Sequence, residues 1–151
     1  AVPGDVFPLY TDIIFGVTEN ICVNSQFDAD RDGNKLSEHR YLRLNLPAAI
    51  PVTFSMVANP APSTPSGGFD CETAPESDPE IHEHSDPDFT VWQNGSFMWF
   101  GFSCEPNSEI TTTSGALPAG DYVIDIYDFR HEDAESPGAY PEQVCFDFTA
   151  N

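Results

Sequence analysis

The feature of this sequence that most constrains its fold is an alternation of apolar and polar residues with a period of two. In residues 40–47, "RYLRLNLP", the side chains of Leu42, Leu44 and Leu46 fall on one face of an extended chain. The chain also contains 14 prolines, and no stretch keeps apolar residues at helical spacing for three turns. The sequence therefore predicts an all-β fold.

Three further stretches repeat the pattern. The apolar residues that share a face are Val52, Phe54 and Met56 in "PVTFSMV", Tyr122, Ile124 and Ile126 in "DYVIDIYDF", and Phe146 and Phe148 in "VCFDFTA". Half-buried antiparallel strands give this alternation, so several of them at short spacing favour an antiparallel β-sandwich. In "TVWQNGSFMWF", the pair Asn94-Gly95 predicts a type I′ turn between strands 89–93 and 96–102.

The length of 151 residues indicates one domain. We expect residues 21–151 to form the sandwich and residues 1–20 to be a leading segment, a linker or an edge strand. Residues 59–87 form an acidic, proline-rich stretch that predicts a long loop.

The charge of the chain excludes two classes of partner. It has 25 acidic and 5 basic side chains, giving a formal net charge of −20. Such a protein repels nucleic acid and anionic lipid headgroups, so we expect neither as a partner. The acidity suits either solubility in a salty medium or the binding of divalent cations.

The four cysteines predict disulfides and an oxidising compartment. Cys22, Cys71, Cys104 and Cys145 form no Cys-x-x-Cys pair, so two disulfides are favoured over zinc. Of the three possible connectivities we favour Cys71–Cys104 with Cys22–Cys145. Disulfides imply a secreted or periplasmic protein, and a chain that begins Ala-Val-Pro is expected of a processed product.

Four stretches together resemble a known family. "YLRLNLPAAIPVTFSMVAN", "DPDFTVWQNGSF", "ITTTSGALPAGDYVIDIYDF" and "CFDFTAN" are similar to the bacterial pre-peptidase C-terminal (PPC) domain, over roughly residues 38–149. Members are jelly-roll-like β-sandwiches attached to exported peptidases and other secreted enzymes. The collagen-binding domain of clostridial collagenases is a calcium-binding relative. The resemblance implies a jelly-roll-like accessory domain without catalysis.

The stretch "FDADRDGN", residues 27–34, predicts a calcium site. Carboxylates at alternate positions precede a turn glycine, and calcium prefers six to eight oxygen ligands. The predicted ligands are Asp28, Asp30, Asp32, Asn34 and Glu38. Glu38 stands before the "YLRL" strand, where the resemblance implies an acidic ligand.

An EF-hand is excluded for this loop, because its closing acid would fall at His39 and the flanks are extended rather than helical. The alternative is a solvated aspartate-rich turn. If Ca²⁺ binds, we expect its role to be structural.

The aromatic residues around the predicted hairpin suggest a ligand-binding surface. Trp92, Phe97 and Trp99 are the candidate substrate-binding residues, as a platform for sugar rings or a protein fibre. Core packing is the alternative, although adjacent Trp99 and Phe100 cannot both point inward in a regular strand.

Catalytic signatures are absent from the sequence. It lacks Gly-x-Ser-x-Gly, a P-loop, a dinucleotide fingerprint and His-Glu-x-x-His, so we expect no enzyme activity. A transition-metal site could be built in "IHEHSDPD" from His82 and His84 with Glu83, Asp86 or Asp88, and a polar loop with two exposed histidines is the favoured alternative. His39 and His131 are isolated, and we expect them at the surface.

The sequence therefore predicts a calcium-stabilised accessory domain of a secreted bacterial enzyme, with a peptidase as the first choice. It would aid folding, secretion or attachment to an insoluble protein fibre or polysaccharide. The alternative is a free-standing secreted carbohydrate-binding module that uses the aromatic hairpin.

Overall fold

The structure is a computed structural model that describes residues 10–24, 39–62, 73, 84–103, 105–128 and 143–151. These residues form nine strands and no helix. The strands are β1 (Tyr10–Ile13), β2 (Glu19–Asn24), β3 (Arg40–Leu46), β4 (Thr53–Ala58), β5 (Pro87–Gln93), β6 (Ser96–Gly101), β7 (Ser108–Thr112), β8 (Gly120–Asp128) and β9 (Gln143–Ala150). The described part thus holds no helix that is long and apolar enough to cross a membrane.

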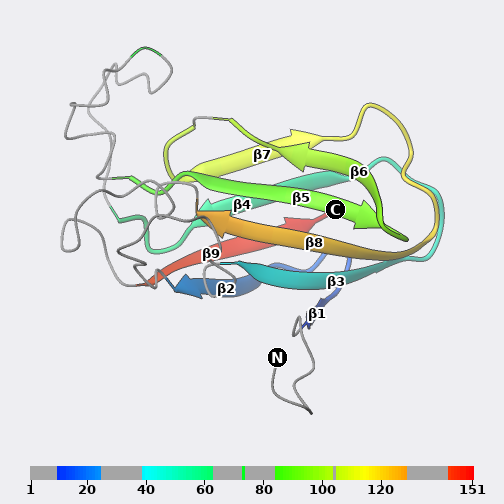
Figure 1. The fold of residues 1–151 in the computed structure, drawn as a ribbon, viewed down its shortest axis with the longest axis horizontal. Coiled ribbons are helices and arrows are strands. Elements are labelled where there is room, and N and C mark those ends of the chain that lie inside the picture. Colours follow the sequence, from blue (N-terminus) through cyan, green and yellow to red (C-terminus); the bar gives the residue numbers. More distant parts are fainter. Residues whose placement is uncertain (1–9, 25–38, 63–72, 74–83, 104, 129–142) are drawn as a thin grey trace.

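The strands build two sheets that pack face to face (Figure 1). One sheet has the order β1-β3-β8-β5-β6, and the other has the order β2-β9-β4-β7. The pairs β2–β9, β3–β8, β4–β7 and β5–β6 are nested, so the chain folds like one long hairpin wrapped into two sheets. This is the arrangement of a jelly roll, and it confirms the predicted antiparallel sandwich.

β1 stands outside this nested pattern. It pairs in parallel with β3 at the edge of the five-stranded sheet. β1 falls within residues 1–20, and β2 begins at Glu19.

The core lies between the two sheets and consists of the predicted apolar faces. Each of its largest members is less than 2% exposed. They include Leu42, Leu44, Leu46, Phe54, Met56, Tyr122, Ile124, Ile126, Phe146 and Phe148. Burial of one such side chain contributes about 1.5–3 kcal/mol, so this core is a main source of the stability of the sandwich.

The Asn-Gly hairpin is confirmed. Asn94 and Gly95 have φ values of 51° and 76°, and Gln93 pairs with Ser96 across the turn. Both positive φ values are those of a type I′ turn, which matches the twist of the two strands. β5 starts two residues before the predicted strand, and β6 ends one residue earlier than predicted.

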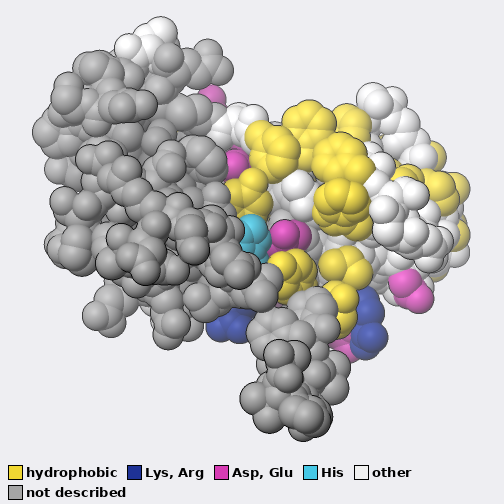
Figure 2. All heavy atoms as spheres, viewed as in Figure 1, with side chains coloured by type: hydrophobic (Ala, Val, Ile, Leu, Met, Phe, Trp, Pro, Cys, Tyr) yellow, Lys and Arg dark blue, Asp and Glu magenta, His cyan; other side chains and the backbone are white. Residues whose placement is uncertain are grey.

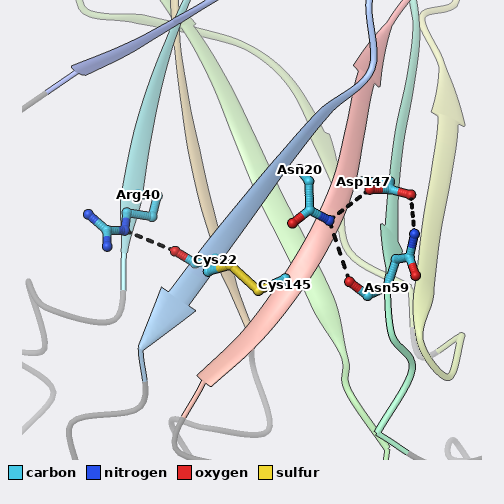
Figure 3. Close-up of a disulfide and its surroundings, with 6 residues drawn as sticks. All are labelled: Asn20, Cys22, Arg40, Asn59, Cys145 and Asp147. Atoms are coloured by element: carbon cyan, nitrogen blue, oxygen red, sulfur yellow. Dashed lines mark hydrogen bonds between the residues drawn. A yellow bond between two sulfur atoms is a disulfide. The ribbon is translucent and has the colours of Figure 1, made fainter.

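One predicted disulfide joins two neighbouring strands (Figure 3). Cys22 and Cys145 face each other directly in the β2–β9 ladder and are bonded through sulfur. The bond confirms one of the two favoured pairs. The other pair, Cys71 and Cys104, lies outside the described residues.

The same region holds a carboxylate between two amides (Figure 3). Oδ1 of Asp147 accepts a hydrogen bond from Nδ2 of Asn20 at 2.8 Å, and Oδ2 accepts one from Nδ2 of Asn59 at 2.7 Å. These bonds to the charged form hold the pKa of Asp147 below its usual value. The carboxylate thus links β2, β9 and the residue that follows β4 on the outer face of the four-stranded sheet.

Candidate functional site

The outer face of the five-stranded sheet carries the polar and aromatic side chains that the core does not use. The strand register arranges them in cross-strand rows. One row is Tyr10, Tyr41, Asp125, Thr90 and Phe100, and the next is Asp12, Arg43, Val123, Trp92 and Phe97. Directly paired side chains in such rows lie about 4.5–5.5 Å apart at Cβ, so each row forms one connected surface.

Four aromatic side chains at the β5–β6 hairpin and just after it form a cluster that we call the aromatic ridge. They are Trp92, Phe97, Phe100 and Phe102, with 37%, 49%, 44% and 49% of their surface exposed. Consecutive ring centroids along the ridge lie 5.3, 5.9 and 5.1 Å apart. Figure 2 shows hydrophobic side chains gathered over β5 and β6 on this face.

A β-bulge creates the ridge. Val91 pairs with Trp99 but Trp92 pairs with Phe97, so Met98 is an extra residue in β6. Such an extra residue reverses the alternation of side chains along the strand. Phe97 therefore shares the outer face with Phe100 instead of pointing to the opposite side.

The bulge also separates the three predicted binding residues. Trp92 and Phe97 lie together on the outer face, whereas Trp99 packs against the core. Its Nε1 donates to Oγ1 of Thr111 at 3.3 Å, which joins β6 to β7 across the edge of the sandwich. Sequence reasoning missed Phe100 as a member of the exposed group. The observation that Trp99 and Phe100 must face opposite ways could have found it.

The rings of the ridge stack rather than lie side by side in one plane. The planes of Phe97 and Phe100 make an angle of 26°, and those of Phe100 and Phe102 make 34°. The first pair is thus stacked with an offset, and the second pair is tilted. Trp92 instead meets Phe97 edge to face, at 77°. The ridge is therefore an uneven apolar surface and not a flat platform.

Beside the ridge, on the same face of the sheet, His39 is hydrogen-bonded to the carboxylate of Asp125. Nδ1 of His39 lies 2.8 Å from Oδ1 of Asp125, and both side chains are 21% exposed. The imidazole also lies against the ring of Tyr127, with centroids 4.8 Å apart. Burial, followed by the negative charge of Asp125, raises the pKa of Tyr41. The expectation that His39 is an isolated surface residue is therefore wrong.

The sequence alone predicts only part of the contact between His39 and Asp125. The alternation in "DYVIDIYDF" puts Asp125 and Tyr127 on the face opposite the core residues. It does not say which residue lies across from them, because His39 is 86 positions away in the chain.

A cluster of buried carboxyl groups lies where β5 begins. Asp86, Asp88, Glu109 and Asp128 are 7%, 7%, 4% and 1% exposed. Asp128 accepts from the backbone N–H of Asp86 and from Oγ of Ser85, each at 3.0 Å. These bonds fix the entry into β5 against the end of β8.

The environment of Asp88 favours its neutral form. Burial, together with the negative charges of Asp86, Glu109 and Asp128, raises the pKa of Asp88 to about 8. A hydrogen bond from Tyr127 acts in the opposite direction. The group is thus an acid that carries a proton at neutral pH.

His84 lies in this buried region too. It is 3% exposed, so the prediction of two exposed histidines in a polar loop is wrong for His84. The other histidine of the motif, His82, lies outside the described residues.

The structure does not test the predicted calcium loop. Its ligands Asp28, Asp30, Asp32, Asn34 and Glu38 all lie outside the described residues. Within the part that the structure describes, no group of three or more His, Cys, Asp or Glu side chains is arranged to hold a metal ion.

Comparison with known proteins adds information on the fold alone. No protein-family model and no curated protein matches the chain. The solved PPC domain of a collagenase from Bacillus anthracis is 8% identical, with a TM-score of 0.54 and 95% of each chain covered.

Two further solved structures are less similar in shape. The surface-associated copper-binding protein CorA of Methylomicrobium album BG8 is 11% identical, with a TM-score of 0.49 over 93% of this chain and 98% of that one. PliG, a periplasmic inhibitor of g-type lysozyme from Aeromonas hydrophila, is 13% identical, with a TM-score of 0.40 over 93% and 95%. The likeness to the PPC domain of the collagenase alone shows that the chain has a PPC-like β-sandwich fold.

Proposed function

We propose that this chain is a non-catalytic accessory domain of a secreted enzyme and that it attaches this enzyme to an insoluble protein substrate. A peptidase is the parent enzyme that we favour. The aromatic ridge is the observation that carries the proposal. It exposes Trp92, Phe97, Phe100 and Phe102 in one contiguous group, each by 37% or more. Contiguous apolar surface of this kind marks interaction sites, and aromatic side chains are enriched in them.

Two observations support the accessory role and the location. The Cys22–Cys145 disulfide is expected of a protein outside the reducing cytosol. The PPC-like fold is shared with a domain of a collagenase, which is an example of such a domain joined to a peptidase. Fold alone does not fix function, so the argument for binding depends on the ridge.

The shape of the ridge favours a protein surface over a polysaccharide. A sugar ring packs flat on an open aromatic face, and stacked rings cover part of each other's faces. Phe100 stacks on Phe97 and is tilted against Phe102, which leaves ring edges that fit apolar side chains. A carbohydrate-binding module remains the second candidate, because Trp92 exposes an indole beside this group.

Retention on insoluble polymers tests the proposal. The purified chain is mixed with fibrillar collagen, elastin, cellulose or chitin, and the pellet is assayed for protein. We expect retention on a protein fibre that falls at least tenfold in the Phe97→Ala/Phe100→Ala variant. Ile110→Ala is the matched control, because Ile110 is 62% exposed on β7 of the other sheet.

The outcomes separate the candidates. Retention on cellulose or chitin that depends on Trp92 would establish the carbohydrate module instead. Retention on none of the four polymers, or equal losses in the ridge and Ile110 variants, would overturn the binding role of the ridge.

We further propose that Ca²⁺ stabilises the domain through Asp28, Asp30, Asp32, Asn34 and Glu38. The support is the chemistry of the donors, which supply carboxylate and carbonyl oxygens at the spacing of a calcium loop. Three alternating carboxylates would repel one another without a cation.

A further inference from the structure

The outer face of the five-stranded sheet has a charged centre between two aromatic groups. We propose that Asp125, with the rings of Tyr41 and Tyr127, forms a subsite for an arginine side chain of the protein that the aromatic ridge binds. This inference rests on the proposed function. Figure 2 shows hydrophobic side chains above and below on this face, with a histidine and acidic side chains between them.

The strand register places the subsite within reach of the ridge. Asp125 on β8 pairs with Thr90 on β5, and Thr90 pairs with Phe100 on β6. Neighbouring strands are about 4.8 Å apart, so Asp125 and Phe100 lie about 10 Å from each other across the sheet. In an extended segment, side chains two positions apart share a face and their Cα atoms lie about 7 Å apart, and the long arginine side chain covers the remaining distance. One apolar residue and one arginine of the same segment can therefore contact both.

The carboxylate is already held in one orientation. Oδ1 of Asp125 accepts from the Nδ1–H of His39 at 2.8 Å, since a carboxylate can only accept. The imidazole is positioned in turn by two rings: it is stacked with Tyr41 at a centroid distance of 6.4 Å and tilted against Tyr127 at 4.8 Å. Oδ2 is then the atom that accepts from the ligand, and a preorganised acceptor loses little freedom on binding.

The surroundings favour a positive ligand. The described residues include two arginines and no lysine. Arg43 is bound by both oxygens of Asp12 at 2.6 and 2.9 Å, and Nε of Arg40 donates to the Cys22 carbonyl at 3.1 Å. In these hydrogen bonds neither arginine is paired with Asp125. The net charge of −20 also steers basic partners toward the protein.

Arginine fits this site better than lysine. Its planar guanidinium stacks on tyrosine rings and donates from a rigid fork, whereas an ammonium is a compact, strongly hydrated charge. A cation over a tyrosine face gains a further attraction when it is within about 6 Å of the ring centroid.

Peptide binding tests the subsite. The probes are the capped hexapeptide Gly-Phe-Arg-Gly-Phe-Arg and the same peptide with citrulline, a neutral isostere, in place of arginine. Affinities are measured by calorimetry at physiological ionic strength for the wild type and for Asp125→Asn. Asparagine keeps an oxygen that accepts from His39, and circular dichroism checks that the fold is intact.

Asp121→Asn is the matched control. Asp121 lies on the same strand and the same face, and it accepts from Nδ2 of Asn45 at 2.7 Å. Each substitution removes one negative charge. We expect Asp125→Asn to weaken binding of the arginine peptide about tenfold, as for loss of a charged hydrogen bond. We expect Asp121→Asn to weaken it by less than about twofold, as for a long-range charge.

Each outcome decides the question. Equal effects of the two substitutions, or equal affinities for arginine and citrulline, would show attraction by net charge and overturn the subsite. Phe100→Ala separates the two proposals. If it weakens both peptides while Asp125→Asn weakens neither, only the subsite fails. If it leaves fibre retention and both peptides unchanged, the proposed function fails.

Discussion

Phe97 and Phe100 project from the same face of β6 with ring centroids 5.9 Å apart, although residues three positions apart in a regular strand face opposite ways. The extra residue Met98 makes this possible by forming a bulge opposite β5. Bulges are common near functional sites because they redirect side chains. Here the effect is to join the aromatic residues of the hairpin into one exposed group.

The fluorescence of the two tryptophans should differ, because the bulge leaves one of them exposed and the other partly buried. Trp92 is 37% exposed, whereas Trp99 packs against the core and bonds to Thr111. In Trp99→Phe we expect the remaining emission to be red-shifted and readily quenched by acrylamide. In Trp92→Phe the remaining emission should be blue-shifted and less quenched. Equal quenching in the two variants would contradict the bulged geometry of β6.

Gly101 is expected to tolerate no side chain. A Cβ at this position would lie 2.5 Å from Cγ of Glu109 and 2.7 Å from Cζ of Phe89. Gly101→Ala should therefore destabilise the protein by about 1–3 kcal/mol through overpacking. Urea denaturation measures the loss.

Gly115→Ala is the control for that substitution. A Cβ at Gly115 meets nothing within 4 Å, so the free energy of unfolding should change by less than about 0.5 kcal/mol. Similar losses in both glycine variants would mean that close packing at Gly101 is not the cause.

The Cys22–Cys145 bond should contribute a large part of the stability. It closes a loop with a sequence separation of 123 residues. A loop of this length restricts the unfolded chain strongly, so the Cys22→Ala/Cys145→Ala variant should lose about 2–5 kcal/mol. The measurement is the denaturation midpoint under non-reducing conditions. An unchanged midpoint would show that the β2–β9 ladder needs no crosslink.

Asp88 should make the protein less stable as the pH rises. Its pKa is about 8 in the folded state against 3.8 for the ordinary group. The folded protein therefore holds a proton between these values that the unfolded chain releases, and stability falls as the pH rises through this window. Asp88→Asn should remove this part of the slope and gain stability relative to the wild type above pH 8.

Denaturation curves at several pH values check the Asp88 prediction. Asp121→Asn is a suitable control, because Asp121 lies at the exposed start of β8. Parallel stability profiles for wild type and Asp88→Asn would mean that Asp88 is ionised in the folded protein.

Calcium should raise the melting temperature if the proposed loop binds it. At a free concentration 100 times the dissociation constant, binding adds about 2.7 kcal/mol, which for a chain of this size is about 5–10 °C. The rise should disappear with chelator and in Asp30→Ala/Asp32→Ala. Identical melting temperatures with calcium and with chelator would show that the loop does not bind calcium and is a solvated turn.

Local patterns in the sequence were sufficient to predict β3, β4, β8 and β9 with their buried faces, and the β5–β6 hairpin. The alternation of Leu42, Leu44 and Leu46 fixes which side of β3 is buried, because a strand has only two faces. Asn94-Gly95 likewise determines its own turn, since few residues accept two successive positive φ values. These signals lie within a few residues of what they predict.

Only the tertiary structure decided which distant residues meet. The nested pairing of strands brings His39 to Asp125 across 86 positions, and buries four carboxyl groups from three separate strands and one loop around the start of β5. The bulge at Met98 moves Trp99 to the core side while Phe100 joins the exposed ridge. Register and bulges depend on how whole strands pack against each other, and no short stretch of sequence contains that information.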